Sequence, residues 1–328
     1  MAAPLRIGIA GYGNLGRGVA AAVRKAPDME LAGIFTRRSP DQITPPAPGV
    51  PVLPWDQLLE HRDRIDVLML CGGSKADLPE HGPALAAHFT TVDSFDTHAK
   101  ISEYFAAVDA PARAGGNTAI ISVGWDPGMF SVNRLLGEAL LPDGATYTFW
   151  GKGLSQGHSD AVRGVPGVAG GVQYTVPSAE AIEAVRSGRR PELSTRQKHT
   201  REVYAVLEDG ADDAAVERAI VTMPHYFAEY DTTVHFISAE ELTRDHGAMP
   251  HGGFVIRSGS TGSGSSQVVE YRLDLGSNPE FTASVLVAYA RAAARLNAQG
   301  DVGAKTVFDV PPGLLSPKPA DQLRAELL

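Results

Sequence analysis

The segment from residue 5 to residue 35 constrains the fold more than any other part of the chain. A short apolar stretch at 5–10 runs directly into the glycine-rich turn GYGNLG at 11–16. An alanine-rich stretch at 17–27 has the composition of a helix, and 29–35 has that of a second strand. This order is a βαβ unit, whose crossover connection favours a parallel sheet.

The same alternation continues to about residue 125. Strand-like segments lie at 64–74, 89–95 and 117–128, with helical segments at 77–88 and 99–115. Repeated strand and helix alternation of this kind predicts an α/β fold with a Rossmann-type, doubly wound dinucleotide-binding domain.

The pattern changes after about residue 145. Strand-like segments then lie at 146–151, 201–209, 230–238, 252–258 and 266–273, with helices expected at 178–187, 211–222 and 279–300. The flexible segment 258–266 is interpreted as a hairpin loop. We therefore expect a second, α+β substrate domain at about 125–274. The dinucleotide-binding domain is expected at 1–124 and about 275–328, with its C-terminal segment packed back on it.

Composition excludes several classes of function. A formal charge of -9 and a pI near 5.6 argue against a broad nucleic-acid-binding or anionic-membrane-binding surface, because such surfaces are basic. No apolar run approaches the ~20 residues that a membrane-spanning helix needs. A single cysteine, Cys71, excludes an internal disulfide and suits a reducing compartment. A cytoplasmic protein is expected.

The glycine turn has the G-x-G-x-x-G spacing of a dinucleotide site, with Gly11, Gly13 and Gly16 at its three positions. The first glycine permits a tight turn, the second lets a pyrophosphate approach the backbone, and the third brings helix and strand together. The motif alone is weak, since glycine turns without ligands are common. Its place between a strand and a helix favours cofactor binding.

The end of the second strand indicates which cofactor is bound. An NAD site usually has an acidic residue there, whereas this chain has Thr36, Arg37 and Arg38. Two guanidinium groups suit a 2′-phosphate, which a carboxylate would repel, so NADP is the predicted cofactor. The alternative is a solvated turn with two arginines. The CGGS segment at 71–74 follows another strand and can approach the same ligand.

Two aspartates follow strands whose ends point toward the cofactor. Asp96 lies in TVDSFDTH and Asp126 in SVGWDPGMF. A carboxylate can hold an ammonium group and help remove its proton before hydride transfer, or activate the water that attacks an imine. The structural alternatives are a helix cap for Asp96 and an Asx turn for Asp126.

The segment FWGKGLSQGHSD at 149–160 combines an aromatic side chain, Trp150, with glycines and polar groups that suit a substrate loop. A loop with one buried tryptophan is the alternative. His251 lies in the bend MPHGG, but the sequence contains no H-E-x-x-H or C-x-x-C motif, so no catalytic metal is expected. A G-x-S-x-G elbow is also missing, which leaves a hydrolase triad unsupported.

Taken together, several long strings resemble the meso-diaminopimelate D-dehydrogenase family. They are GYGNLGR, GIFTRR, WDPGMFS, FWGKGLSQGHSDA, VQYTVPS, AMPHGG and NPEFTAS, and the resemblance spans residues 5 to 316. It implies NADP-dependent oxidative deamination of the D-centre of meso-2,6-diaminopimelate, with release of ammonia. The product, L-2-amino-6-oxopimelate, cyclises to tetrahydrodipicolinate, a lysine precursor. The resemblance also implies a homodimer, with dimerisation assigned to the second domain.

The resemblance implies a role for each matching position. The cofactor-binding residues would be Gly11, Tyr12, Gly13, Asn14, Leu15, Thr36, Arg37, Arg38, Cys71, Gly72, Gly73, Ser74, Ser94, Phe95, Val123, Gly124, Trp125 and Pro127. Asp96 and Asp126 would act at the reacting centre, without a decision on which is the base. The substrate would also contact Trp125, Trp150, Gln156, Gly157 and Asp160, while Thr175, Arg201, His251 and Asn278 would recognise its distal L-centre.

Two other functions remain open at this point. The chain could be an NADP-linked oxidoreductase with the same two-domain plan but another substrate, including a D-amino-acid dehydrogenase of broader specificity. It could also be a non-catalytic NADP-sensing protein, although such a protein has no need for Asp96, Asp126 and Arg201 together. No nucleic-acid or membrane partner is expected.

Overall fold

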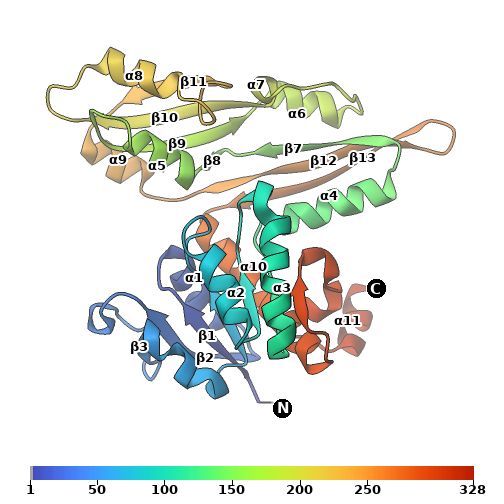
Figure 1. The fold of residues 1–328 in the computed structure, drawn as a ribbon. Coiled ribbons are helices and arrows are strands. Elements are labelled where there is room, and N and C mark those ends of the chain that lie inside the picture. Colours follow the sequence, from blue (N-terminus) through green and yellow to red (C-terminus); the bar gives the residue numbers. More distant parts are fainter. Residues whose placement is uncertain (1–2) are drawn as a thin grey trace. The chain divides into compact units, whose positions relative to one another are not determined.

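The computed structural model describes residues 3–328 and divides into two compact units. Unit 1 comprises the chain up to Val132 together with Pro279–Leu328, and unit 2 comprises Asn133–Asn278 (Figure 1). Unit 2 is therefore an insertion in the sequence of unit 1. The α-helix at this first boundary, α4 (Met129–Leu140), contains residues of both units.

Unit 1 is built on a parallel sheet of seven strands in the order β14-β6-β5-β4-β1-β2-β3. Its strands are β1 (Leu5–Ala10), β2 (Met29–Thr36), β3 (Val52–Pro54), β4 (Val67–Leu70), β5 (Thr91–Asp93), β6 (Thr118–Ile120) and β14 (Gly303–Lys305). Every neighbouring pair is parallel. The doubly wound sheet predicted from the sequence is confirmed.

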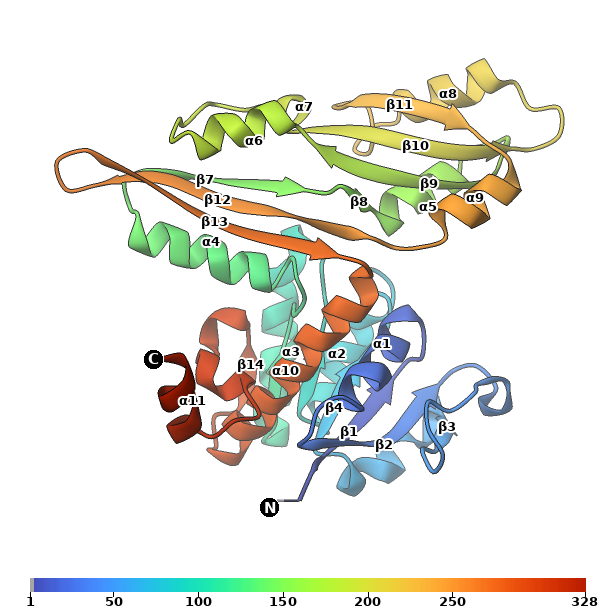
Figure 2. The ribbon, with the colours of Figure 1, turned by 180° about the vertical axis from the view of Figure 1, so that it is seen from behind.

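Helices cover both faces of this sheet. The α-helices of unit 1 besides α4 are α1 (Asn14–Val23), α2 (Leu78–Ala86), α3 (Ile101–Gly115), α10 (Asn278–Ala298) and α11 (Ala320–Leu327). Short 3-10 helices lie at Pro40–Gln42, Trp55–Arg64, His98–Lys100, Val307–Asp309 and Pro312–Leu315. Figure 1 shows α2 and α3 on one side of the strands, and Figure 2 shows α10 on the other.

Alternation along the buried strands explains the two apolar cores of unit 1. In β4, Val67 and Met69 pack with α1 and α10, whereas Leu68 and Leu70 pack with α2 and α3. Successive side chains of a strand point to opposite faces, so an unbroken apolar strand is buried on both sides. The sequence VLML at 67–70 is therefore what a central parallel strand requires.

Unit 2 contains two smaller sheets. One has the order β11-β10-β9-β8 and the other the order β13-β12-β7, and only the β10–β11 pair is parallel. The strands are β7 (Gly144–Trp150), β8 (Gly153–Leu154), β9 (Val168–Pro177), β10 (His199–Leu207), β11 (Asp231–Phe236), β12 (His251–Thr261) and β13 (Ser265–Leu275). The helices are α5 (Gln156–Arg163), α6 (Ala179–Arg186), α7 (Thr195–Lys198), α8 (Asp213–Val221) and α9 (Ala239–His246). The predicted α+β domain with a mostly antiparallel sheet is confirmed.

The loop of the hairpin predicted at residues 258–266 is shorter than expected, because the two strands are longer. β12 continues to Thr261 and β13 begins at Ser265, with these two residues paired, so only 262–264 form the turn. Gly262 and Gly264 have φ values of 54° and 113°, which glycine adopts without strain. The serines and glycines were interpreted as a loop, but backbone pairing with the other strand holds them extended.

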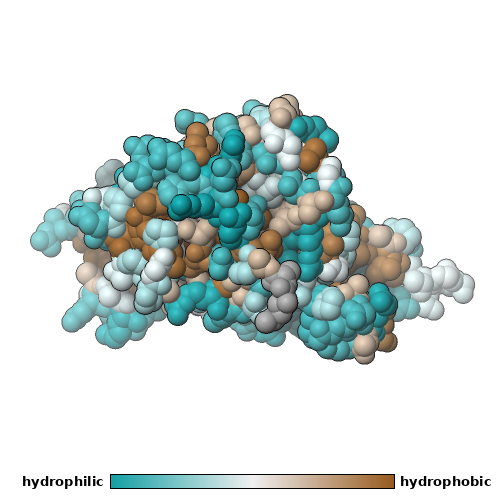
Figure 3. All heavy atoms as spheres, turned by 90° about the horizontal axis from the view of Figure 1, so that it is seen from below, coloured by the Kyte–Doolittle hydropathy of each residue, from teal (hydrophilic) through white to brown (hydrophobic). Residues whose placement is uncertain are grey.

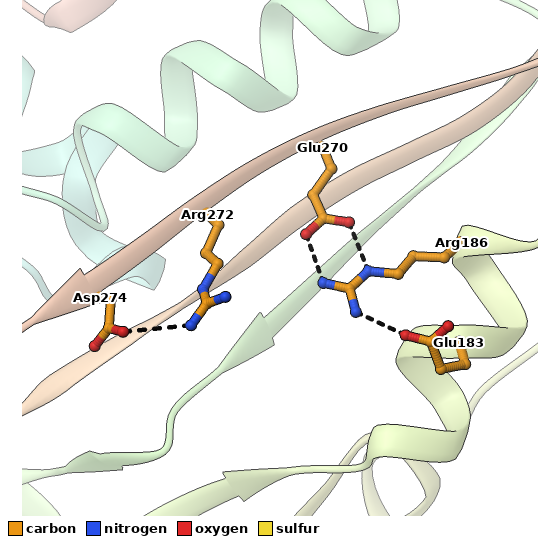
Figure 4. A network of polar contacts seen from close by, with 5 residues as sticks. All are labelled: Glu183, Arg186, Glu270, Arg272 and Asp274. Carbon is orange, nitrogen blue, oxygen red and sulfur yellow. Dashed lines mark hydrogen bonds and ion pairs between the residues drawn. The ribbon is translucent and has the colours of Figure 1, made fainter.

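An arginine fork anchors α6 to β13 (Figure 4). Arg186 Nε and Nη2 donate to the two carboxylate oxygens of Glu270 at 2.7 and 2.6 Å, and Nη1 donates to Glu183 at 2.7 Å. Two guanidinium groups also lie over the Phe254 ring: the guanidinium carbon of Arg186 is 5.1 Å from the ring centroid, and that of Arg272 is 5.5 Å from it. These contacts tie a helix to the three-stranded sheet.

Figure 3 shows one face, on which apolar residues gather between hydrophilic ones. A cavity of about 920 Å³ in unit 1 has a largely apolar lining that includes Ala294, Ala298, Pro317 and Pro319. None of the helices formed by residues 3–328 is long and apolar enough to span a bilayer.

Candidate functional site

The glycine turn of unit 1 has the backbone that its motif predicts. Gly11 has a φ of 97°, and a Cβ atom on Gly16 would lie 2.2 Å from the Gly11 carbonyl oxygen. Gly16 is therefore required for the close approach of α1 to the turn. Gly13 precedes α1, and a Cβ atom there would meet nothing within 4 Å. The N-terminus of α1 thus faces open space at the position where this motif binds a pyrophosphate.

The arginines after β2 line a cavity of about 390 Å³. Its walls are Thr36, Arg37, Arg38, Ser39, Pro40, Pro54, Trp55 and Asp56. The Arg38 amide donates to Thr36 Oγ1 at 3.1 Å, and its guanidinium donates to the Tyr12 carbonyl. These bonds connect the arginine turn to the glycine turn.

Asp77 forms a salt bridge with Arg37, the other arginine of the pair. Its Oδ1 lies 2.9 Å from Arg37 Nη1, and its Oδ2 accepts the Gly73 amide at 2.7 Å. These donors lower the pKa of Asp77, the Gly73 amide having the largest effect. Asp77 was not identified from the sequence. It connects the CGGS turn to the arginine pair, and a Cβ atom on Gly72 would lie 2.8 Å from the Asp77 Cβ.

The other residues of the CGGS turn have distinct environments. Burial raises the pKa of Cys71 to about 12, so its thiol stays protonated near neutral pH. Ser74 Oγ accepts the backbone amide of Asp96 at 2.8 Å. The turn after β4 thereby fixes the backbone of the predicted catalytic aspartate, whose residue is exposed.

A buried carboxylate that the sequence analysis did not select organises the ends of β5 and β6. Asp93 accepts the amides of Phe95 and Ser122 at 2.9 and 3.0 Å and the Tyr104 hydroxyl at 2.8 Å. Burial outweighs these three hydrogen bonds and raises its pKa to about 6. Asp93, the last residue of β5, is buried, whereas Asp96, three positions later, is exposed.

Two of the predicted cofactor residues have side chains in the core. Phe95 stacks on Tyr104 with 4.1 Å between ring centroids, and Val123 packs in the α1–α10 core. Only their backbone is therefore available to a ligand. Ser94, between Asp93 and Phe95, is half-buried.

A rigid turn carries Asp126. The amides of Met129 and Phe130 donate to the carbonyls of Gly124 and Trp125 at 2.9 and 2.8 Å. A Cβ atom on Gly128 would lie 1.8 Å from the Gly124 oxygen. Trp125 is 8% exposed, and the Asp126–Pro127 peptide is cis. Asp126 is half-buried on a turn with little freedom.

In unit 2, Arg201 is buried without an acidic partner. It is 6% exposed, its guanidinium carbon lies 3.9 Å from the Tyr230 ring centroid, and Nη1 donates to Thr175 Oγ1. No carboxylate pairs with it among residues 3–328, and its Nε has no hydrogen-bond partner. Burial lowers its pKa, an effect that Tyr230 partly offsets, but an arginine remains charged. A buried guanidinium without an acidic partner suits an anionic ligand.

The other residues predicted for the distal end gather around β8 and β9. Thr175 pairs with both Arg201 and Gly153 in the sheet. A Cβ atom on Gly153 would lie 2.4 Å from the His251 ring, so these residues are in contact.

Met249 completes this group. Gln156 Nε2 lies 3.0 Å from the Met249 sulfur, and the Asn278 amide donates to the Met249 carbonyl at 2.9 Å. Gln156, Thr175, Arg201, His251 and Asn278 therefore belong to one cluster in unit 2, although up to 122 positions separate them in the sequence.

The aromatic residue at the end of β7 has a histidine beneath it. His199 Nε2 accepts the Trp150 amide at 2.9 Å, and the two rings stack with 5.4 Å between centroids. Burial and, to a smaller extent, Arg201 and Lys198 lower the His199 pKa to about 4, so His199 is neutral. The Trp150 residue itself is 37% exposed, which leaves part of its surface available.

Gly157 and Asp160 lie on α5 rather than in an irregular loop. Gly157 faces open space, whereas the Asp160 carboxylate is exposed and pairs with Arg163. Neither β9 nor α5 was predicted from the sequence, because α5 is a short polar helix and the glycines at 170 and 171 interrupt the strand pattern of β9.

Comparison with known proteins identifies the family. The model of the diaminopimelic acid dehydrogenase C-terminal domain matches residues 124–277. Meso-diaminopimelate D-dehydrogenase from Ureibacillus thermosphaericus is 63% identical over 324 residues, which cover 99% of each chain. The chain belongs to the meso-diaminopimelate D-dehydrogenase family.

Solved structures of this family extend the match to the fold. A substituted meso-DAPDH from Clostridium tetani E88, with DAP, is 51% identical and has a TM-score of 0.94, covering 99% of this chain and 100% of that one. An engineered D-amino acid dehydrogenase bound to NADP+ is 44% identical with a TM-score of 0.86, at 99% and 100% coverage. The resemblance to the meso-diaminopimelate D-dehydrogenase family stated from the sequence is confirmed.

Proposed function

We propose that this protein catalyses the reversible, NADP-dependent oxidative deamination of the D-centre of meso-2,6-diaminopimelate. The products are L-2-amino-6-oxopimelate, which cyclises to tetrahydrodipicolinate, and ammonia, in lysine biosynthesis. The observation that carries the proposal is the buried, acid-free Arg201 in a member of this family. A cofactor-binding protein without a dicarboxylate substrate has no need for such a group.

The residues of unit 1 fit NADP. The open N-terminus of α1 at Gly13 suits the pyrophosphate, and the cavity lined by Thr36, Arg37 and Arg38 suits the 2′-phosphate. We assign the remaining predicted cofactor positions to the same ligand, with Phe95 and Val123 acting through their backbone. When bound, NADP would accept the hydride from the D-centre.

Asp96 and Asp126 are the proposed groups at the reacting centre. Each follows a strand of the parallel sheet, at the edge where ligands of such sheets bind. One carboxylate would hold the substrate ammonium and the other would remove a proton from it; a carboxylate would then activate water toward the imine. Ordered turns hold both backbones, which limits the reorganisation that these steps require.

Arg201 is the proposed group for the carboxylate of the L-centre. Three groups would surround this distal end of the substrate: the Thr175 hydroxyl, His251 and Asn278. The rest of the substrate would contact Gln156, Gly157 and Asp160 on α5 and the ring of Trp150. An amino acid that lacks this carboxylate would leave the buried guanidinium without a partner. Such a substrate should be rejected strongly.

A homodimer is part of the proposal, with unit 2 as the dimerisation domain. Val268 and Val269 of β13 are 40% and 44% exposed, and Leu135, Leu136 and Leu140 of α4 are also exposed. Exposed apolar residues on a sheet and a helix of one unit support a contact with a second copy.

The direct test follows NADPH absorbance with purified protein. Meso-diaminopimelate with NADP should give NADPH, while L,L-diaminopimelate, which has no D-centre, should give none. NAD should support a much slower reaction because it lacks the 2′-phosphate. No NADPH from meso-diaminopimelate, or equal rates with both stereoisomers, would reject the proposed function.

A further inference from the structure

His158 on α5 contacts Arg201, and the proposed function assigns it no role. His158 Nε2 lies 3.4 Å from Arg201 Nη2, and His158 Nδ1 lies 2.9 Å from Ser155 Oγ. Arginine nitrogens only donate hydrogen bonds, so His158 Nε2 is the acceptor. The ring proton is therefore on Nδ1, which donates to the serine hydroxyl. This tautomer is fixed at both nitrogens.

The surroundings of His158 keep it neutral. Two aromatic rings pack against the imidazole of His158. The centroids of the Tyr226 and Phe227 rings lie 5.3 and 5.9 Å from the imidazole centroid, and both rings are nearly perpendicular to it. Burial and the Arg201 charge lower its pKa to about 4. A neutral imidazole can accept from Arg201, whereas an imidazolium would have no lone pair to offer and would repel the guanidinium.

Three groups together define the orientation of the guanidinium. Tyr230 lies against its face, Thr175 accepts from Nη1 and His158 accepts from Nη2. Nε is left buried without a partner. The guanidinium is thus fixed in its plane, and no acid within residues 3–328 neutralises its charge.

We propose that His158 is a positioning residue for substrate specificity, which orients Arg201 to bind the distal carboxylate of the substrate. This deepens the proposed function and rests on it. A neutral acceptor suits the task better than an acid. A carboxylate at this position would neutralise Arg201 and compete with the substrate for it, whereas the imidazole orients the cation and leaves its charge available.

The test uses paired substrates and paired variants. D-lysine equals meso-diaminopimelate without the distal carboxylate, so the ratio of kcat/KM for the two compounds measures recognition of that group. His158→Phe keeps the ring packing but removes the acceptor, and His158→Gln restores an acceptor. D-lysine is followed as a substrate and, independently, as a competitive inhibitor.

His158→Phe should reduce the preference for meso-diaminopimelate over D-lysine about ten- to hundred-fold, mainly through KM, as expected for losing one hydrogen bond to a charged group. His158→Gln should recover much of it. In an Arg201→Met background, His158→Phe should change the ratio little, because the group that it orients is gone.

A matched control is His246, also in unit 2, whose Nδ1 lies 3.0 Å from the Tyr174 hydroxyl. His246→Phe should leave the substrate ratio at the wild-type value. Equal losses on both compounds in His158→Phe, no rescue by glutamine, or a full effect without Arg201 would overturn the positioning role. If the wild type does not oxidise meso-diaminopimelate at all, the proposed function fails first, and the dissociation constants of the two compounds, measured by calorimetry with wild type and His158→Phe, still test recognition of the carboxylate.

Discussion

The two units hold positive charge in opposite ways. In unit 1, Arg37 and Arg38 are exposed, and the Arg37 side chain, 62% exposed, pairs with Asp77. In unit 2, Arg201 is 6% exposed and stacks on Tyr230 without an acid. Water screens the first pair, whereas the surroundings of Arg201 screen it little.

This difference separates affinity from selectivity. Solvated arginines add attraction for a phosphate at little cost to folding, and without Arg37 the Asp77 carboxylate still accepts the Gly73 amide. A dry guanidinium destabilises the folded chain until an anion reaches it, so it discriminates strongly against ligands without that anion. Under the proposed function, cofactor preference and substrate specificity would therefore depend on arginines in contrasting environments.

The largest expected effect is at the buried arginine. Arg201→Met should lower kcat/KM for meso-diaminopimelate about a thousand-fold, because a carboxylate would then be buried unpaired. It should also raise the free energy of unfolding by about 1–3 kcal/mol, since an uncompensated charge is removed. Steady-state kinetics measures the first quantity, and chemical denaturation without substrate measures the second. A variant that is less stable than the wild type would contradict the contrast.

A smaller effect is expected at the exposed pair. Replacing Arg37 and Arg38 together by alanine should raise KM for NADP about a hundred-fold and alter KM for NAD only slightly, because only NADP has the 2′-phosphate. The free energy of unfolding should change by less than about 0.5 kcal/mol. Parallel losses with both cofactors would show that these arginines do not distinguish them.

The smallest effect is a difference in pH response between the units. His158 and His199 in unit 2 have pKa values of about 4, below the unfolded value near 6.5, so the unfolded state binds more protons between these values. Unit 2 should lose stability as the pH falls through that window. Asp93 in unit 1 has a pKa of about 6, above its unfolded value of 3.8, so it contributes stability as the pH falls through 6.

Hydrogen-exchange protection factors, compared near neutral pH and near pH 5, can separate these responses. Protection should fall more in the core of unit 2 than in that of unit 1, and His199→Gln should reduce the difference. The same loss in both units would argue against opposite contributions from these buried groups.

The sequence predicted unit 1 better than unit 2 for physical reasons. A parallel sheet needs apolar strands and a glycine turn, and both are local signals, as VLML and GYGNLG show. The strands of unit 2 have weaker local signals: β8 has two residues, β13 is mostly exposed, and the ends of β12 and β13 are held extended by pairing although their serines and glycines are typical of a loop.

The supporting residues of the sites were the least predictable part. Asp93, His158, His199 and Tyr230 gain their properties from burial and from partners distant in sequence. His158 lies in the segment 149–160 that was predicted as a substrate loop, but the sequence did not single it out, and only its contact with Arg201 of β10 gives it an acceptor role. No sequence motif indicated Asp77, because its role depends on contacts with two turns that are separate in the sequence, at Arg37 and at Gly73.

The insertion of unit 2 into the sequence of unit 1 has a consequence for synthesis on the ribosome. The sheet of unit 1 lacks β14, and its core lacks α10, until residues 279–328 have been made. Arg291, which donates to both carboxylate oxygens of Asp28 at 2.6 and 2.7 Å, joins positions 263 residues apart. All of unit 2 emerges before this contact can form. The nascent chain must therefore keep an incomplete unit 1 from aggregating while unit 2 folds.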